Sequence, residues 1–363
     1  MYDIAMSMPL ANDATGRRNN FGLLRVAFAT LVIVAHSSEL VDGNRSRELM
    51  TRVFGTMSLG DLAVDGFFII SGYLISKSFV DRESTGQFLM RRISRIVPAF
   101  AVSFWLCVFL LAPWVGAGRT VATWPVLRYQ LARFLLLMPP DVHNVFKGLA
   151  YPTLDASMWT ISYEFACYLA TMAIGVLGVL DRRMRFVWLV ITPTMVTLSA
   201  MRLADYFGGA LHDYILNSLR FGAFYSVGIT YFLFRDRVPL ARNVAVIAAV
   251  VLCVLLFDAR TAEAAVAIAG GYLVFWFALQ VPEWRLSRAV NRTDLSYGVY
   301  LYAWPVQSLV IWFDRTINPW LLCAISLSLT SALAFVSWKF VEKPVLQFAH
   351  RGRERSGVAR TGR

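Results

Sequence analysis

The sequence predicts an all-α polytopic membrane protein with about ten transmembrane helices and both termini in the cytoplasm. Three observations predict this class. The 363 residues are 57% hydrophobic and only 16% charged, and the mean hydropathy is +0.55, which is outside the usual range of soluble domains. Apolar runs of about 17 to 25 residues recur along the whole chain, each long enough to cross the hydrocarbon core as a helix. Lys and Arg gather in alternate loops between these runs.

The apolar runs give the expected helices in chain order. They cover residues 21–40, 61–80, 97–115, 158–180, 186–202, 214–234, 243–258, 264–281, 295–313 and 319–340. The polar residues 1–20 predict a disordered cytoplasmic N-terminus, and residues 346–363 predict a basic cytoplasmic tail. The transmembrane domain between them covers residues 21–345.

The basic residues predict which loops face the cytoplasm. One set of alternate loops carries arginine clusters, which include Arg91, Arg92 and Arg95, then Arg182, Arg183 and Arg185, then Arg235, Arg237 and Arg242. The positive-inside rule places this set of loops and both termini in the cytoplasm. The loop at 116–157 is then external, and its LRYQLARFLLL stretch predicts a short amphipathic helix along the membrane interface.

The net charge of +12 would suggest a nucleic-acid partner in a soluble protein. Here the basic residues lie between apolar runs, so we expect them to contact anionic lipid headgroups, and we expect no nucleic-acid partner. The N-terminus lacks the pattern of a removable signal peptide. The cysteines each lie inside an apolar run without metal-ligand spacing, so we expect packing residues and no metal site; they are Cys107, Cys167, Cys253 and Cys323.

The first apolar run contains two groups that hydrocarbon disfavours, Arg25 and His36. They are eleven positions apart, which places them on one helix face and about 16 Å apart along the axis. Glu39 can share this face near the outer surface. Histidine is suited to take and return a proton near neutral pH, so His36 is the candidate base. The alternative is that Arg25 reaches lipid phosphates and that His36 is a hydrogen-bonded core histidine.

Two further runs carry buried acidic residues. Asp61 and Asp65 are one turn apart in the second run, and Asp65 is deep enough to require a partner, either Arg25 or another buried cation. Glu164 lies about one and a half turns into the fourth run, near Trp159, Ser162 and Tyr163. A belt of aromatic residues at the membrane interface explains the Trp and the Tyr, but it does not explain Glu164.

Arg91, Arg92 and Arg95 lie at helical spacing on the side predicted to be cytoplasmic. Guanidinium groups bind phosphate oxygens in pairs, so these residues suit a phosphate-rich ligand. The alternative is ordinary positive-inside charge that contacts lipid headgroups.

Taken in order, these motifs resemble the acyltransferase-3 family of bacterial membrane O-acyltransferases, which modify cell-surface and secreted glycans. The resemblance rests on the Arg25 and His36 spacing, on VDGFFIISGYLI with Asp65 and Ser71, on RRISR, on the Trp159, Ser162 and Glu164 stretch, on SYGVYLYAWPV, and on VEKP at 341–344. One departure is Ala303, which stands before Trp304 where many relatives have a histidine. A catalytic role at that position is therefore not carried over.

The resemblance implies transfer of an acyl group, most often acetyl, from acyl-coenzyme A (acyl-CoA) to a sugar hydroxyl at the bacterial inner membrane. The expected acceptor is an exopolysaccharide, an O-antigen or a lipid-linked glycan precursor. His36 would be a general base or a transient acyl carrier, with Glu164 and Asp65 as further catalytic residues. Arg25, Arg92 and Arg95 would bind the CoA phosphates. The residues expected to contact the sugar are Glu39, Trp159, Ser162, Tyr163 and Trp304.

Two alternatives from other classes remain open. A transporter or flippase of a glycan or small solute would use the same buried Arg, His and Asp as a coupling relay. The paired arginines and the lack of obvious broken helices favour the enzyme. A membrane scaffold without chemistry would leave the intramembrane charges unexplained.

Overall fold

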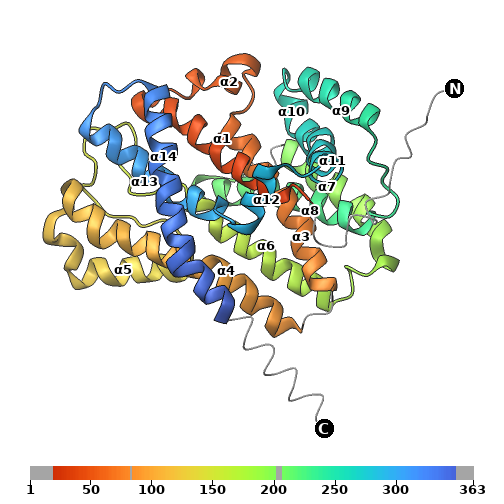
Figure 1. Cartoon of the computed structure of the whole chain (residues 1–363), viewed down its shortest axis with the longest axis horizontal. Coiled ribbons are helices and arrows are strands. Elements are labelled where there is room, and N and C mark those ends of the chain that lie inside the picture. The colour runs from red at the N-terminus through yellow and green to blue at the C-terminus, as the bar shows by residue number, and fades with distance from the viewer. Residues whose placement is uncertain (1–18, 82–83, 202–206, 349–363) are drawn as a thin grey trace, which may run out of the picture. The chain divides into compact units, whose positions relative to one another are not determined.

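The structure is a computed structural model that describes residues 19–81, 84–201 and 207–348 (Figure 1). All the regular elements of this part of the chain are helices. The all-α prediction is therefore confirmed. The expected disordered N-terminus and basic tail fall almost entirely on residues 1–18 and 349–363, which lie outside the described residues.

Each expected apolar run contains a helix. The helices are α1 (Phe21–Asp42), α2 (Leu49–Phe54), α3 (Leu59–Val80), α4 (Thr85–Leu106), α5 (Trp124–Leu135), α6 (Trp159–Val176), α7 (Trp188–Ala200), α8 (Gly209–Leu233), α9 (Arg242–Leu255), α10 (Ala259–Ala265), α11 (Gly271–Gln280), α12 (Arg285–Arg292), α13 (Ser296–Phe313) and α14 (Pro319–Ser337). The stretch expected to form an amphipathic helix is α5.

Several of these helices have the length and composition of membrane spans. In the described part of the chain, five helical segments meet both conditions: Phe21–Asp42, Leu59–Val80, Thr85–Ala122, Ala259–Gln280 and Pro319–Phe348. Several spans in one chain are typical of a multi-pass membrane protein. The count of about ten and the cytoplasmic termini stay predictions.

The chain folds into two compact units. Unit 1 comprises residues 1–28, 48–83 and 169–292, and unit 2 comprises residues 29–47, 84–168 and 293–363. The unbroken helix α1 contributes its beginning to unit 1 and the rest to unit 2. Each unit is described by itself below.

In unit 1, α3 and α8 pack at very close range. A Cβ atom at Gly72 of α3 would lie 2.1 Å from the Tyr225 carbonyl oxygen, and one at Gly228 of α8 would lie 2.1 Å from the Ile69 carbonyl oxygen. Only glycine fits at either position, because backbone atoms cannot move aside as a flexible side chain can. The SGY sequence of the second apolar run therefore marks a helix contact, as small residues do in membrane proteins.

In unit 2, α13 packs against α14 and is buried along most of its length. A Cβ atom at Gly298 would lie 2.9 Å from the Ala334 Cβ atom, so two small residues bring these helices together. Polar side chains at Tyr297, Tyr300, Trp304 and Gln307 recur at helical spacing and share one face of α13. We call these four residues the α13 stripe.

The segment that follows α4 in unit 2 is irregular. It continues through short helical turns at Cys107–Leu111, Pro113–Ala117 and Gly118–Ala122 before α5. Gly116 has a φ of +130°, and a Cβ atom there would lie 2.4 Å from the Asn144 carbonyl oxygen. Because residue 116 is a glycine, this segment can pack against the loop between α5 and α6.

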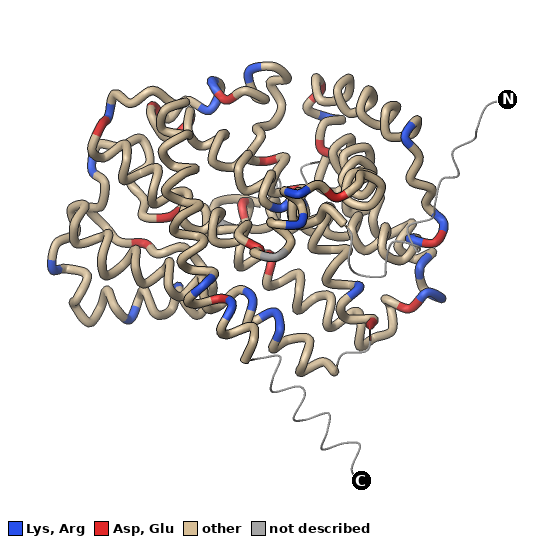
Figure 2. The backbone as a smooth tube through the Cα atoms, in the orientation of Figure 1, with Lys and Arg blue, Asp and Glu red and all other residues tan. Residues whose placement is uncertain are grey.

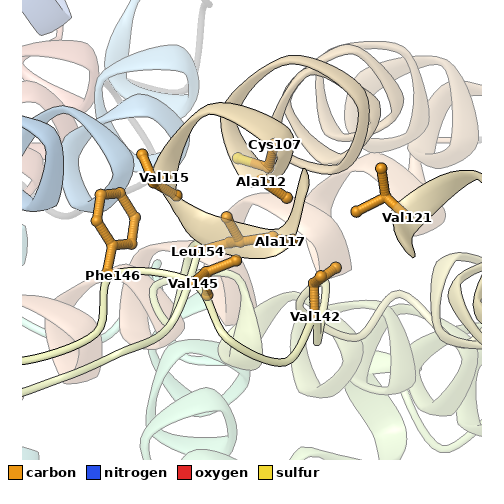
Figure 3. Packing of buried hydrophobic residues seen from close by; sticks show 9 residues of the cluster. All are labelled: Cys107, Ala112, Val115, Ala117, Val121, Val142, Val145, Phe146 and Leu154. Carbon is orange, nitrogen blue, oxygen red and sulfur yellow. The ribbon is translucent and has the colours of Figure 1, made fainter. Parts of the chain in front are cut away.

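The loop of residues 136–158 is held by a hydrophobic core of its own (Figure 3). The core residues are Cys107, Ala112, Val115, Ala117, Val121, Val142, Val145, Phe146 and Leu154. Gln130 of α5 adds two hydrogen bonds with the backbone of Asp141, at 2.6 and 3.1 Å. The loop is therefore a packed element that can hold side chains in fixed positions.

Candidate active site

His36 and Glu39 lie on the same face of α1, in the part of the helix that belongs to unit 2. The His36 Nδ1 atom is 3.4 Å from the Glu39 Oε2 atom. When Nδ1 carries the proton, it donates to the carboxylate, and the Nε2 lone pair stays available to accept another proton. The arrangement has the geometry of a base and the carboxylate that orients it.

Tyr151, from the loop of residues 136–158, completes this group. Its hydroxyl donates a hydrogen bond of 2.9 Å to Glu39 Oε1, the carboxylate oxygen that does not face His36. The Arg45 Nε atom lies 3.8 Å from Glu39 Oε2. We call His36, Glu39 and Tyr151 the histidine cluster.

Trp304 of α13 packs against the histidine cluster. Its ring meets the His36 ring edge to face, with 5.0 Å between the centroids, and the Tyr151 ring with 5.8 Å. Trp304 is 5% exposed, so its ring is not an open platform for a sugar. The structure thus places Trp304 in contact with the imidazole, and its stacking on a sugar stays a prediction.

The α13 stripe connects the histidine cluster with other parts of unit 2. One turn before Trp304, the Tyr300 hydroxyl donates to the Ser157 carbonyl oxygen at 2.7 Å. One turn after Trp304, the Gln307 Nε2 atom donates to the Ile33 carbonyl oxygen at 3.0 Å. These bonds fix α13 against the loop and against α1 on both sides of Trp304.

The loop also carries a buried carboxyl group, Asp155. One of its oxygens accepts hydrogen bonds from the Ser157 backbone and hydroxyl, at 3.0 and 2.6 Å. In the described part of the chain, the other oxygen, Oδ2, is buried without a hydrogen-bond partner. Burial raises the pKa of Asp155 to about 8. This group anchors the end of the loop that leads into α6.

Arg95, expected to bind phosphate, is held by two carboxylates of unit 2. Its guanidinium lies 2.6 Å from Asp294 and 4.0 Å from Glu342 of the VEKP motif. Glu342 lies in the helical turn Trp338–Glu342 that follows α14, and Figure 2 shows this end of the helix beside the first half of α4. Arg95 is therefore a largely neutralised cation that links the residue stretch before α13 to the turn after α14.

Arg92 has a different environment on α4. Its guanidinium lies over the rings of Phe88 and Tyr168, at 5.5 and 5.9 Å from the centroids. The Tyr168 hydroxyl donates a short hydrogen bond to Glu164. Glu164, a predicted catalytic residue, thus lies next to Arg92 through Tyr168, whereas His36 contacts Glu39 and Trp304.

Trp159, Ser162 and Tyr163 lie in the first turns of α6. The Trp159 and Tyr163 rings meet edge to face at 5.8 Å, and the Ser162 hydroxyl donates to the Trp159 carbonyl oxygen at 3.2 Å. Trp159 is 36% exposed. Of the residues predicted to contact a sugar, Trp159 has the most accessible aromatic ring.

Asp65 has its partner in unit 1. The Arg220 guanidinium of α8 forms two hydrogen bonds of 3.0 Å with the two Asp65 oxygens and a third, of 3.3 Å, with Asp61. The sequence predicted that Asp65 pairs either with Arg25 or with another buried cation. The structure shows another cation, Arg220. This ion pair accounts for the burial of Asp65, and its catalytic role stays a prediction.

Sequence reasoning missed three residues of these groups: Tyr151, Asp294 and Arg220. None lies within helical spacing of its partner, and Tyr151 is 112 positions from Glu39. A weak signal existed for the Arg95 site, because the VEKP motif supplies Glu342. Arg25 lies in unit 1, eleven residues before His36 on the continuous helix α1, and its side chain is half-buried.

The chain is similar in sequence to known acyltransferases and to a nodulation protein. The O-acetyl transferase of Shigella phage Sf6 is 28% identical over 340 residues, which cover 91% of this chain and 96% of the phage protein. Nodulation protein 10 of Rhizobium leguminosarum bv. viciae is 26% identical over 368 residues, with 93% and 96% covered. Acyltransferase MdmB of Streptomyces mycarofaciens is 30% identical over 149 residues, which cover 39% of this chain and 35% of that protein.

No solved structure matches the chain significantly. The family model of the acyltransferase domain matches residues 18–339, which include the histidine cluster, the arginines of α4 and the α13 stripe. The chain therefore belongs to the acyltransferase-3 family and is an acyltransferase.

Proposed function

We propose that this protein transfers an acyl group from acyl-CoA to a sugar hydroxyl of a glycan at the bacterial inner membrane. Acetyl is the favoured group, because the phage relative is named an O-acetyl transferase. The favoured acceptors are an exopolysaccharide, an O-antigen or a lipid-linked glycan precursor. The family match over residues 18–339 favours acyl transfer over the transporter alternative.

The observation that carries the proposal is the histidine cluster. Glu39 holds the His36 Nδ1 proton, so Nε2 accepts the proton of the sugar hydroxyl while the hydroxyl oxygen attacks the thioester carbonyl carbon. The carbon–sulfur bond then breaks, and the imidazolium returns its proton to the leaving CoA sulfur. The products are the sugar ester and free CoA thiol, and His36 ends as it began.

The same geometry allows a second path, in which Nε2 attacks the thioester and carries the acyl group as an acyl-imidazole. Incubation with radiolabelled acetyl-CoA and no acceptor distinguishes the two paths. A label on the His36 peptide supports the acyl carrier, and an unlabelled protein that is active when acceptor is added supports the base.

For the donor, we propose Arg92 as the main phosphate contact of unit 2. Arg95 is already paired with Asp294 and Glu342, so its role is to position α4 against α13 and α14. Arg25, which lies in unit 1, stays a predicted contact of the donor phosphates.

For the acceptor, we propose Trp159 and Tyr163 as the aromatic contacts of the sugar. Their rings lie at the start of α6, and the neighbouring Thr160 bonds to Tyr300 of the α13 stripe at 2.7 Å. Ser162 and Glu164 lie on the next turn of the same helix and can bind sugar hydroxyls.

The proposal is tested with His36→Ala. Removal of the base should lower the rate of glycan acylation by about 100-fold or more. Mass spectrometry of the glycan measures the ester content, and immunoblotting of membranes measures protein abundance. His143→Ala is the matched control, because His143 is exposed in the loop of residues 136–158. Normal ester content in the His36→Ala strain would contradict the proposal.

A further inference from the structure

We propose that Tyr151 is a positioning residue that sets how much of the Glu39 charge faces His36, and thereby the pH range in which His36 acts as a base. This inference rests on the proposed function, because it concerns the same histidine. It adds a residue to the site that neither the sequence motifs nor the family match singles out.

The geometry gives the two oxygens of Glu39 different partners. Oε2 faces His36 Nδ1 at 3.4 Å, and Oε1 accepts the Tyr151 hydroxyl at 2.9 Å. The shorter bond draws negative charge toward Oε1 and fixes the rotation of the carboxylate. Tyr151 therefore acts on His36 through Glu39 without touching the imidazole nitrogens.

Three segments of unit 2 contribute groups that face the His36–Glu39 pair of α1: the turn after α1, the loop of residues 136–158, and α13. Glu39 lies on α1, and Arg45 lies in the short helical turn that follows it. Tyr151 comes from the loop, and α13 contributes the neutral indole of Trp304. Arg45 is 56% exposed and 3.8 Å from Glu39, so water screens much of its attraction. Tyr151 is thus the closest hydrogen-bond donor to Glu39 among these groups.

Tyr151 is suited to be a constant donor. Burial, together with its hydrogen bond to Glu39, raises the pKa of the Tyr151 hydroxyl above its ordinary value. The hydroxyl therefore keeps its proton over the whole range in which a histidine titrates. The ring packs against a hydrophobic group that includes Leu40, Trp304 and Ile317, which holds the hydroxyl in place.

The expected effects of two substitutions have opposite signs. Tyr151→Phe removes the donor from Oε1, so more negative charge faces His36 and the imidazolium is favoured. The pH at which a reagent for the neutral imidazole modifies His36 at half its full rate should then rise. Glu39→Gln removes the negative charge, so this pH should fall.

Carbethoxylation by diethyl pyrocarbonate tests these shifts, because the reagent modifies only the neutral imidazole. The rate for the His36 peptide is measured by mass spectrometry between pH 5 and 8 on the purified full chain. The exposed His143 is the internal control in every sample. The matched control variant is Tyr129→Phe, which removes another tyrosine–carboxylate hydrogen bond of 2.9 Å, to Asp141.

The midpoint is the pH at which the His36 peptide is modified at half its full rate. The proposal expects this midpoint to rise in Tyr151→Phe, to fall in Glu39→Gln and to stay unchanged in Tyr129→Phe. An unchanged or lowered midpoint in Tyr151→Phe overturns it, because Tyr151 would then only pack. The assay needs neither acyl donor nor acceptor. A wild-type protein that transfers no acyl group would thus refute the proposed function, while the midpoints still decide the role of Tyr151.

Discussion

Single residues of one type differ in role because their surroundings differ, as Arg92 and Arg95 of α4 show. Both are basic and one turn apart, yet Arg95 pairs with Asp294 and Glu342, while Arg92 lies over the rings of Phe88 and Tyr168. A guanidinium that is already paired with carboxylates has little charge left for a phosphate. The ion pairs therefore give Arg95 a structural role, and phosphate binding by Arg92 is part of the proposed function.

This difference predicts separable effects. Arg92→Gln should raise the KM for acyl-CoA about tenfold or more, because a charge-assisted bond to phosphate is lost, with little change in abundance. Arg95→Gln should lower abundance and thermal stability, because the buried ion pairs with Asp294 and Glu342 would be lost. Steady-state kinetics and thermal unfolding in detergent measure the two effects. Arg128→Gln, at an exposed position of α5, is the control. An unchanged KM in Arg92→Gln would return this residue to the lipid-headgroup role.

At this scale, sequence reasoning succeeds where partners are close in the chain. Glu39 follows His36 by three positions, so a helix alone brings them together. Tyr151 reaches Glu39 only because a packed loop of unit 2 holds it there, and Arg220 reaches Asp65 across 155 positions. Such contacts depend on tertiary packing, which a single sequence does not contain.

Among the elements, α3 and α8 show how glycines determine a helix contact. Hydropathy predicts the boundaries of this helix well: the second apolar run covers residues 61–80, and α3 covers Leu59–Val80. The close approach at Gly72 was not evident from hydrophobicity, because glycine contributes little to an apolar pattern. Its role depends on the Tyr225 backbone, which belongs to another helix.

Gly72→Ala should therefore destabilise the protein. The new Cβ would lie 2.1 Å from a backbone oxygen, so α3 and α8 must separate, at a cost of about 1 to 3 kcal/mol or more. Gly86→Ala is the control, because no atom lies within 4 Å of a Cβ at this position of α4. Thermal unfolding in detergent compares the variants. If Gly72→Ala and Gly86→Ala were equally stable, the α3–α8 contact would have room for an added methyl group, and the prediction would be wrong.

For the whole molecule, composition predicted the class, and charge predicted the orientation. An all-α chain with apolar runs was confirmed, because hydrocarbon requires long apolar helices whatever their packing. The division into two units was not predicted. Each unit is assembled from separate stretches of the chain, and α1 contributes to both. Hydropathy reads the chain one window at a time, so it carries no information on such an assembly.

The predicted orientation is tested with single cysteines in a background without the native ones. The single-cysteine variant His143→Cys should react with an impermeant maleimide in intact spheroplasts, because the loop of residues 136–158 is expected to be external. A cysteine in Arg183→Cys should react only after the membrane is permeabilised. Both positions are exposed, so access to the reagent is otherwise equal. The reverse pattern would invert the topology.

The α13 stripe has a consequence for how this chain can change in evolution. Its four side chains share one face; Tyr300 contacts the loop of residues 136–158, and Trp304 and Gln307 contact α1. One inserted residue after Tyr297 would rotate the rest of the helix by about 100°, and all three contacts would be lost together. Substitutions on the other faces of α13 leave this register intact. The length of α13 between Tyr297 and Gln307 is thus constrained more tightly than the identity of most of its residues.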